Sequence, residues 1–170
     1  NQTELTSLSF MREEEKLARD VYITLYNKWG VTIFTNISNS EQTHMDAILM
    51  LLNKYSQIDP VGSNGVGVFA NTTLQTLYNQ LVTQGNASVV DAYKVGATIE
   101  DLDIFDLKTA LISIDNQDIR LVYEMLTKGS RNHMRSFYKN ILNVGGTYTP
   151  LYITQAEFDA IINSPMETGF

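Results

Sequence analysis

The sequence predicts an all-α protein with four long helices, arranged as two helical hairpins joined by a long crossover, plus short extra helices. Apolar residues recur at alternating steps of three and four along four long stretches. No stretch shows the apolar–polar alternation of a strand. We treat residues 1–170 as one domain, with the four-helix bundle over about 5–144 and a C-terminal extension with a short helix over about 145–170.

The first hairpin is predicted from a helix over about 5–29, ended by Gly30, and a helix from about Phe34 or Asn39 to Tyr55. The segment that follows, "SQIDPVGSNGVGVFANTT", is rich in Gly, Asn and Ser and is predicted as a loop. Its glycines do not match a dinucleotide-binding fingerprint. A short helix, "LQTLYNQLVTQG", is expected to end at Gly85.

The second hairpin is predicted from a helix capped by Asn86 or Ser88 that continues to about residue 113. Asp115 is expected to cap the next helix, which continues to about residue 144 and ends at a Gly-Gly pair.

The C-terminal extension begins with an extended connector, "YTPLYI", because the residue before a proline disfavours helix. The capping-box pattern Thr154-Gln-Ala-Glu157 then predicts a last short helix to about residue 163.

Composition excludes several classes of protein. The formal net charge of −7 argues against a nucleic-acid partner or an anionic membrane surface. The chain has no cysteine, which excludes disulfides, thiolate catalysis and iron–sulfur clusters. No apolar run is long enough for a membrane span. The sequence starts at Asn1 rather than Met, which is compatible with export and removal of a signal segment, so the compartment stays open.

A carboxylate lies on the apolar stripe of the first helix. In "FMREEEKLARDVY", counting by threes and fours from Glu15 gives otherwise apolar or aromatic positions: Leu8, Met11, Ala18, Tyr22, Leu25 and Trp29. We therefore predict that Glu15 faces the interior, while Glu13 and Glu14 point away from that stripe, toward water. A carboxylate among core residues is costly unless something pairs with it.

The other three stripes are also interrupted by polar residues near their middle. The second helix contributes Glu41 and His44, and the third contributes Glu100 and Asp103. The fourth contributes Ser130 and His133; the strings "EQTHM" and "SRNHM" suggest a duplicated hairpin.

These stripes predict a metal centre at one level of the bundle, made by Glu15, Glu41, His44, Glu100, Asp103 and His133. Four carboxylates and two imidazoles suit two divalent cations such as iron, manganese or zinc. The competing interpretation is a protonated, hydrogen-bonded polar network, since a lone Glu-x-x-His is a weak signal. Carboxylates gathered without a basic residue on the stripes would repel one another, which favours metal.

These motifs resemble the ferritin-like superfamily, which includes rubrerythrins and bacterioferritins. The rubrerythrin pattern Glu-x-x-Ala-Arg-x-x-Tyr is matched by Glu15, Ala18, Arg19 and Tyr22. More closely, "EEEKLARDVY", "SEQTHM", "GATIEDLDIFDL" and "GSRNH" resemble an uncharacterised prokaryotic domain-of-unknown-function family placed in that superfamily. The resemblance implies two bound iron ions and, if the protein is an enzyme, a di-iron carboxylate oxidoreductase acting on oxygen or peroxide. A homodimer is compatible with it.

The chain departs from the superfamily at Ser130, where the fourth helix usually carries a glutamate. We expect Asp103, one helical turn after Glu100, to supply the missing carboxylate, with Ser130 limited to a hydrogen bond. The substitution leaves a mononuclear or degenerate site open, and with it a non-enzymatic module for metal storage or protein interaction. The absence of cysteine also removes the rubredoxin partner found in rubrerythrins.

Overall fold

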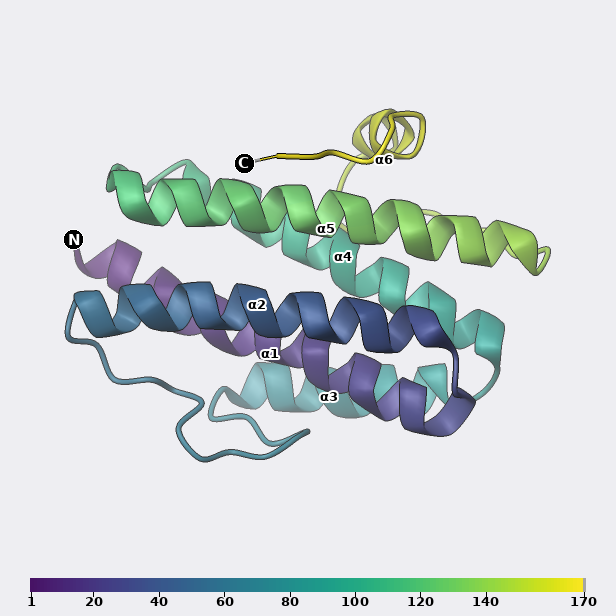
Figure 1. The fold of residues 1–170 in the computed structure, drawn as a ribbon, viewed down its shortest axis with the longest axis horizontal. Coiled ribbons are helices and arrows are strands. Elements are labelled where there is room, and N and C mark those ends of the chain that lie inside the picture. The colour runs from purple at the N-terminus through teal and green to yellow at the C-terminus, as the bar shows by residue number, and fades with distance from the viewer. Residues whose placement is uncertain (170) are drawn as a thin grey trace.

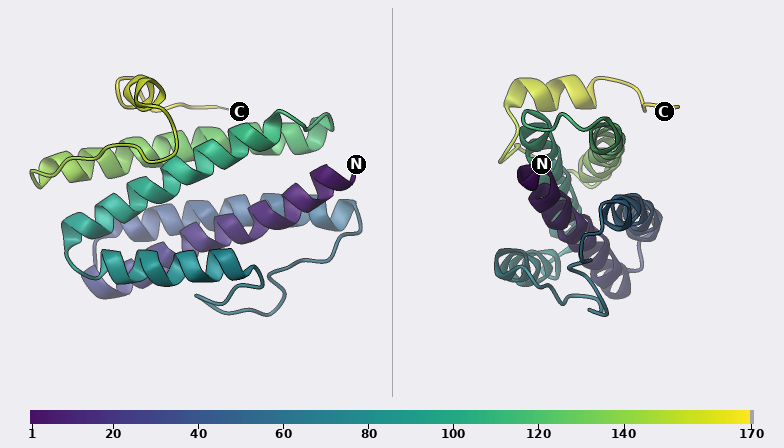
Figure 2. Two further views of the ribbon diagram at one scale, coloured as in Figure 1. Left: turned by 180° about the vertical axis from the view of Figure 1, so that it is seen from behind. Right: turned by 90° about the vertical axis from the view of Figure 1, so that its left-hand side faces the viewer.

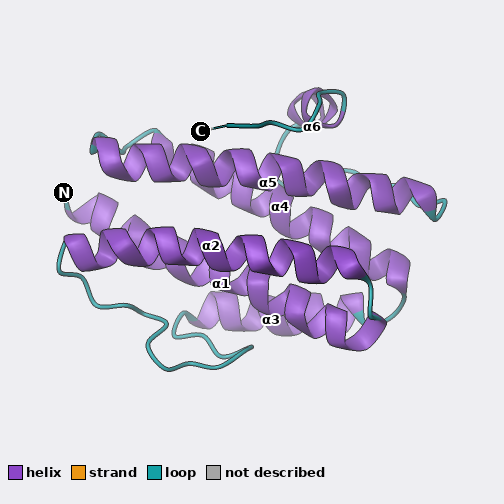
Figure 3. Cartoon of the chain, in the orientation of Figure 1, coloured by secondary structure: helices purple, strands orange, loops and turns teal. Residues whose placement is uncertain are grey.

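The computed structural model describes residues 1–169, which form six helices and no strand (Figure 3). The all-α prediction is confirmed. The helices are α1 (Gln2–Trp29), α2 (Thr32–Lys54), α3 (Thr72–Gly85), α4 (Val89–Leu111), α5 (Gln117–Asn143) and α6 (Gln155–Ile162). Within residues 1–169, no helix is long and apolar enough to cross a membrane.

Four long helices lie side by side as two hairpins, α1 with α2 and α4 with α5 (Figure 1). The crossover over residues 55–88 contains α3, which contacts α1 and α4 (Figure 2). The short helix α6 packs on α5, on the opposite side of the molecule from α3. The crossover therefore covers a face of α1 that the four long helices leave open.

The helix starts of the first half differ from the predicted ones. The Asn1 side chain accepts a hydrogen bond from the Glu4 backbone and completes a capping box, so α1 begins at Gln2. The cap of α2 is Val31, which makes no side-chain capping hydrogen bond, so the sequence carries no start signal there. The end of α1 is as predicted, because Gly30 adopts the left-handed conformation with φ 65°.

The second half follows its predicted caps more closely. Ser88 caps α4 and Thr154 forms the predicted capping box of α6. Asp115 does not cap α5: Asn116 does, by accepting hydrogen bonds from the two backbone N–H groups at Asp118 and Ile119. Aspartate and asparagine are both good caps. The backbone N–H groups of residues 115 and 116 donate to Glu4, which holds this turn so that the helix begins one residue later than predicted.

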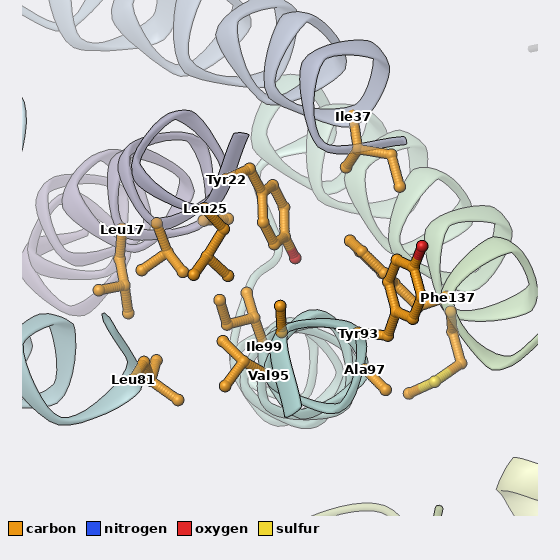
Figure 4. Close-up of a cluster of buried hydrophobic side chains, with 14 of the residues drawn as sticks. Leu17, Tyr22, Leu25, Ile37, Leu81, Tyr93, Val95, Ala97, Ile99 and Phe137 are labelled. Carbon is orange, nitrogen blue, oxygen red and sulfur yellow. The ribbon is translucent and has the colours of Figure 1, made fainter. Parts of the chain in front are cut away.

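Apolar packing forms two clusters along the bundle. One includes Leu25, Phe34 and Phe137, and the other includes Leu8, Ile48 and Leu126. Figure 4 shows part of the first cluster, with the Tyr22 hydroxyl directed from α1 toward α4. On α1, α2 and α5 the polar residues of the predicted metal centre lie between the residues of the two clusters, whereas on α4 Glu100 and Asp103 lie between Ile99 and Ile104 of the first cluster.

The prediction that Glu13 and Glu14 face water is wrong. Both are buried, as is Glu15. The crossover supplies the reason, because Glu13 accepts hydrogen bonds from the backbone N–H groups of Ala70 and Asn71 at 2.6 and 3.0 Å. Glu13 and Glu14 do lie on a different face of α1 from Glu15, as the helical period requires, but other parts of the chain cover that face too.

Candidate metal centre

Five of the six predicted ligands meet in the interior. Two of them come from α2, and α1, α4 and α5 contribute one each. Glu15, Glu41 and His44 form one group, and Glu41, Glu100 and His133 form another; in each group one donor atom per residue lies within 4.8 Å of the others. All five residues are buried. Glu41 belongs to both groups, so its two oxygens face two potential cation positions.

Both histidines present the same ring nitrogen to the carboxylates. Nδ1 of His44 lies 3.0 Å from Glu15 Oε2 and 2.8 Å from Glu41 Oε2. Nδ1 of His133 lies 2.8 Å from Glu41 Oε1 and 3.4 Å from Glu100 Oε1. Glu41 and His44 are three residues apart on α2, which places both on one face of the helix. The centre is thus nearly symmetric about Glu41.

The atoms behind these ligands hold them in place. Nε2 of His133 lies 3.0 Å from Ser40 Oγ, so a proton shared there leaves Nδ1 free for a cation. The Tyr22 hydroxyl donates to Glu100 Oε1 at 2.6 Å. Tyr22 is therefore more than a core aromatic, because its hydroxyl orients one of the carboxylates.

Three other buried carboxylates are explained by the fold. Glu13 binds the crossover, as described above, and Glu4 binds the start of α5. Asp101 accepts the backbone N–H groups of residues 151, 152 and 153 and the Tyr148 hydroxyl, which fastens the C-terminal connector. Each of these carboxylates replaces lost water with several N–H or O–H donors.

The predicted ligands lack such partners. Among the described residues, the buried side-chain atoms without a hydrogen-bond partner all belong to Glu14, Glu15, Glu41, Glu100, Asp103, Ser130 and His133. The Glu41 oxygens approach the two imidazoles closely, but without the alignment of hydrogen bonds. Unpaired buried acceptors gathered at one level fit a missing cation, because native interiors rarely leave them unsatisfied.

Buried cations of the first helix are engaged elsewhere. Lys16 pairs with Asp20 and donates to the Gly65 carbonyl at 2.7 Å. Arg12 pairs with Asp59 at 2.9 Å and donates to the Met45 carbonyl. Neither one neutralises the central carboxylates.

Burial and the pairing of carboxylates with histidines act in opposite directions on the pKa values of the centre. Burial raises the pKa of Glu15 to about 7, against the lowering effect of His44, and raises the pKa of Glu100 to about 7, against the lowering effect of His133. Burial lowers the pKa of His133, but Glu41 and Glu100 outweigh it and raise that pKa to about 10. Protons thus occupy the centre in the metal-free chain, and a binding cation displaces them.

Asp103, the sixth predicted ligand, is buried with both oxygens unpaired but belongs to neither group of donors. Burial, followed by the charges of Glu14 and Glu15, raises its pKa well above the usual range. The Ser130 hydroxyl is likewise buried and unpaired. Asp103 therefore lies one helical turn from Glu100 on α4 but outside both groups of donors.

Sequence reasoning missed Glu14. Its two oxygens are buried and unpaired, and burial together with the charge of Asp106 raises its pKa well above the usual range. The only signal for it was its place beside Glu15, because Glu14 lies off the apolar stripe of α1.

A glycine on α5 leaves room for His44. A Cβ atom at Gly129 would lie 2.6 Å from both Cε1 and Nε2 of the His44 ring. We expect Gly129→Ala to push the ring off its carboxylates and to weaken metal binding about tenfold or more. Helix content should be kept, since Ala favours helix over Gly by about 1 kcal/mol.

Isothermal titration with a divalent metal would measure this effect. Gly65→Ala is the control, because a Cβ there meets no atom within 4 Å. Equal affinities for the two variants would show that the position of His44 does not matter for binding.

Comparison with known proteins places the chain. The family profile described as "Uncharacterized protein domain (DUF2202)" matches residues 4–165. The chain belongs to this family. An uncharacterized protein of Methanocaldococcus jannaschii, MJ0754, is 56% identical over 169 residues, which cover 99% of this chain and 91% of that protein.

A solved structure of this DUF2202 relative is also similar. The crystal structure of the hypothetical protein MJ0754 matches with a TM-score of 0.95 and 57% identity, over 96% of this chain and 93% of that one. Neither name states an activity, so the function has to be argued from the buried centre.

Proposed function

We propose that this chain is a ferritin-like protein that binds two divalent cations, with iron the expected metal and manganese or zinc as alternatives. The observation that carries the proposal is the pair of donor groups that share Glu41, in which each cation would meet one histidine and two carboxylates. Mixed oxygen and nitrogen donors of this kind suit these metals.

The path of the chain supports the ferritin-like assignment. Two helical hairpins joined by a long crossover, with inward carboxylates on three helices and Glu-x-x-His on one, follow the arrangement of carboxylate-bridged metal proteins. The fourth helix keeps His133 but has Ser130 in place of a carboxylate. Glu41, which is common to both donor groups, would then be the ligand that the two cations share.

Redox chemistry toward oxygen or peroxide is the activity that such a centre would supply with iron bound. The chain's own contribution is to bury the ligands, to orient Glu100 through Tyr22, and to orient His133 through Ser40. The absent fourth-helix carboxylate favours a second candidate, a storage or binding module without turnover. Peroxide consumption by the iron-loaded protein separates the two functions.

Metal loading tests the proposal directly. After anaerobic incubation with iron(II) and desalting, elemental analysis should give about two ions per chain, because two donor groups are present. Binding should also raise the melting temperature. A free ion concentration about a hundred times Kd adds about 2.7 kcal/mol to the free energy of unfolding, or roughly 5–10 °C for a chain of this size.

The control is the same protein kept in a chelator throughout. One ion per chain would indicate a mononuclear site. Well below one ion, with a melting temperature indifferent to iron, manganese and zinc, would rule out the buried centre.

A further inference from the structure

We propose that a cavity lined by α1, α3 and α4 is the port through which divalent cations reach the buried centre, with Glu14 and Asp106 as the carboxylates that capture them. This inference rests on the proposed metal-binding function. It concerns the route to the centre, which neither the family nor the relatives assign.

The cavity has a volume of about 520 Å³. Residues of α3 line it together with Leu102 and Asp106 of α4 and with Phe10 and Glu14 of α1. That volume is many times the roughly 30 Å³ of a water molecule, so a hydrated cation fits. Three threonines, Thr72, Thr73 and Thr76, add oxygen atoms along the wall formed by α3.

The charge of this cavity distinguishes it from others on the molecule. Glu14 and Asp106 line it, and no Lys or Arg is among its lining residues. Four other cavities of the described chain each have at least one Lys or Arg in their walls. A concave surface lined by charge of one sign concentrates the opposite ion and raises its association rate.

Glu14 itself points to a ligand. It is fully buried, and neither of its oxygens has a hydrogen-bond partner. Glu13, its neighbour on α1, shows the alternative, because its oxygens are satisfied by backbone N–H groups of the crossover. The other acid in the cavity lining is Asp106, and no Lys or Arg accompanies the two, so a passing cation would supply the compensation that buried charge requires.

Carboxyl groups on α1 and α4 connect this cavity with the centre along the two helices. Asp106 is half-buried in its wall, and its charge acts on Glu14. Asp103 lies one helical turn before Asp106 and one turn after Glu100 on α4, and Glu14 is the residue next to Glu15 on α1. One face of α4 thus carries carboxyl groups at each turn from the cavity wall to Glu100 of the centre.

Loading kinetics test the port. Cobalt(II) is the probe, because its visible absorption changes when it enters a site with nitrogen and oxygen donors. Stopped-flow mixing would compare wild type with Glu14→Gln and Asp106→Asn, and titration would give the final stoichiometry of each. Loss of a steering carboxylate should slow loading about tenfold or more, with the final stoichiometry and spectrum unchanged. The wild-type rate should also fall more steeply with salt than that of either variant.

The matched control is Glu124→Gln, which removes an exposed carboxylate from a different cavity. If Glu14→Gln fails to fold, as judged by circular dichroism, the half-buried Asp106→Asn still decides the question. Loading at the wild-type rate in the variants overturns the port. A lower final stoichiometry also overturns it, because Glu14 or Asp106 would then hold an ion at the centre. A wild-type chain that takes up no cobalt(II) instead overturns the proposed function itself.

Discussion

Replacing Glu41 with Gln is expected to abolish high-affinity binding of both cations. Glu41 is the residue common to the two donor groups, and its oxygens lie 2.8 Å from the Nδ1 atoms of His44 and His133. An amide at this position offers one weaker acceptor oxygen and turns its NH₂ toward the second cation. The loss should exceed the roughly ten- to hundredfold that follows removal of a group supporting a ligand.

Glu15→Gln provides the graded comparison. Glu15 belongs to only one group, so this variant should retain about one ion per chain while Glu41→Gln retains none. Titration with elemental analysis measures both.

Glu13→Gln is the structural control, since it also alters a buried carboxylate of α1 but one that binds the crossover. It should cost about 1–3 kcal/mol of stability and leave stoichiometry unchanged. Two ions per chain in Glu41→Gln would contradict the shared-ligand geometry.

Asp103→Asn is expected to lose far more metal affinity than Ser130→Ala. Two divalent ions bring four positive charges, and Glu15, Glu41 and Glu100 supply three negative ones. Asp103 is the buried carboxylate one helical turn from Glu100 that would balance the remaining charge, and both of its oxygens are unpaired. The Ser130 hydroxyl is neutral, so its removal should stay within the roughly ten- to hundredfold range of a supporting hydrogen bond.

Without metal, the Asp103→Asn substitution should raise the stability of the chain rather than lower it. Burial, with Glu14 and Glu15 next, raises the pKa of Asp103, so the ionised form is disfavoured in the folded state. A carboxyl group whose pKa is raised by folding lowers the free energy of unfolding at any pH above its pKa in the unfolded chain. This loss of stability disappears as the pH falls. Asp103→Asn removes it, so at pH 7 the metal-free variant should melt higher than wild type while binding metal more weakly.

Metal titration and thermal melting of the same samples check both halves of this prediction. If Asp103→Asn binds metal as wild type does, or Ser130→Ala is the more damaging change, Asp103 does not complete the site. A mononuclear site would then be favoured.

Local periodicity was enough to predict much of this protein. Steps of three and four along each long helix put Glu15, Glu41, His44, Glu100 and His133 at one interior level, and the structure brings these five together. A helix repeats its direction every 3.6 residues whatever surrounds it, so facing residues can be found without knowing the partners. Caps with a side-chain signal, such as Ser88 and Thr154, were predictable for the same local reason.

Tertiary packing decided the rest. Periodicity states that Glu13 and Glu14 point away from Glu15, but only the crossover determines that this second face of α1 is buried. It likewise takes the packed bundle to show that Glu41 is shared by both groups while Asp103 lies outside them. The physical reason is that a helix sets the direction of a side chain through neighbouring residues, whereas contacts between segments far apart in the chain decide what that side chain meets.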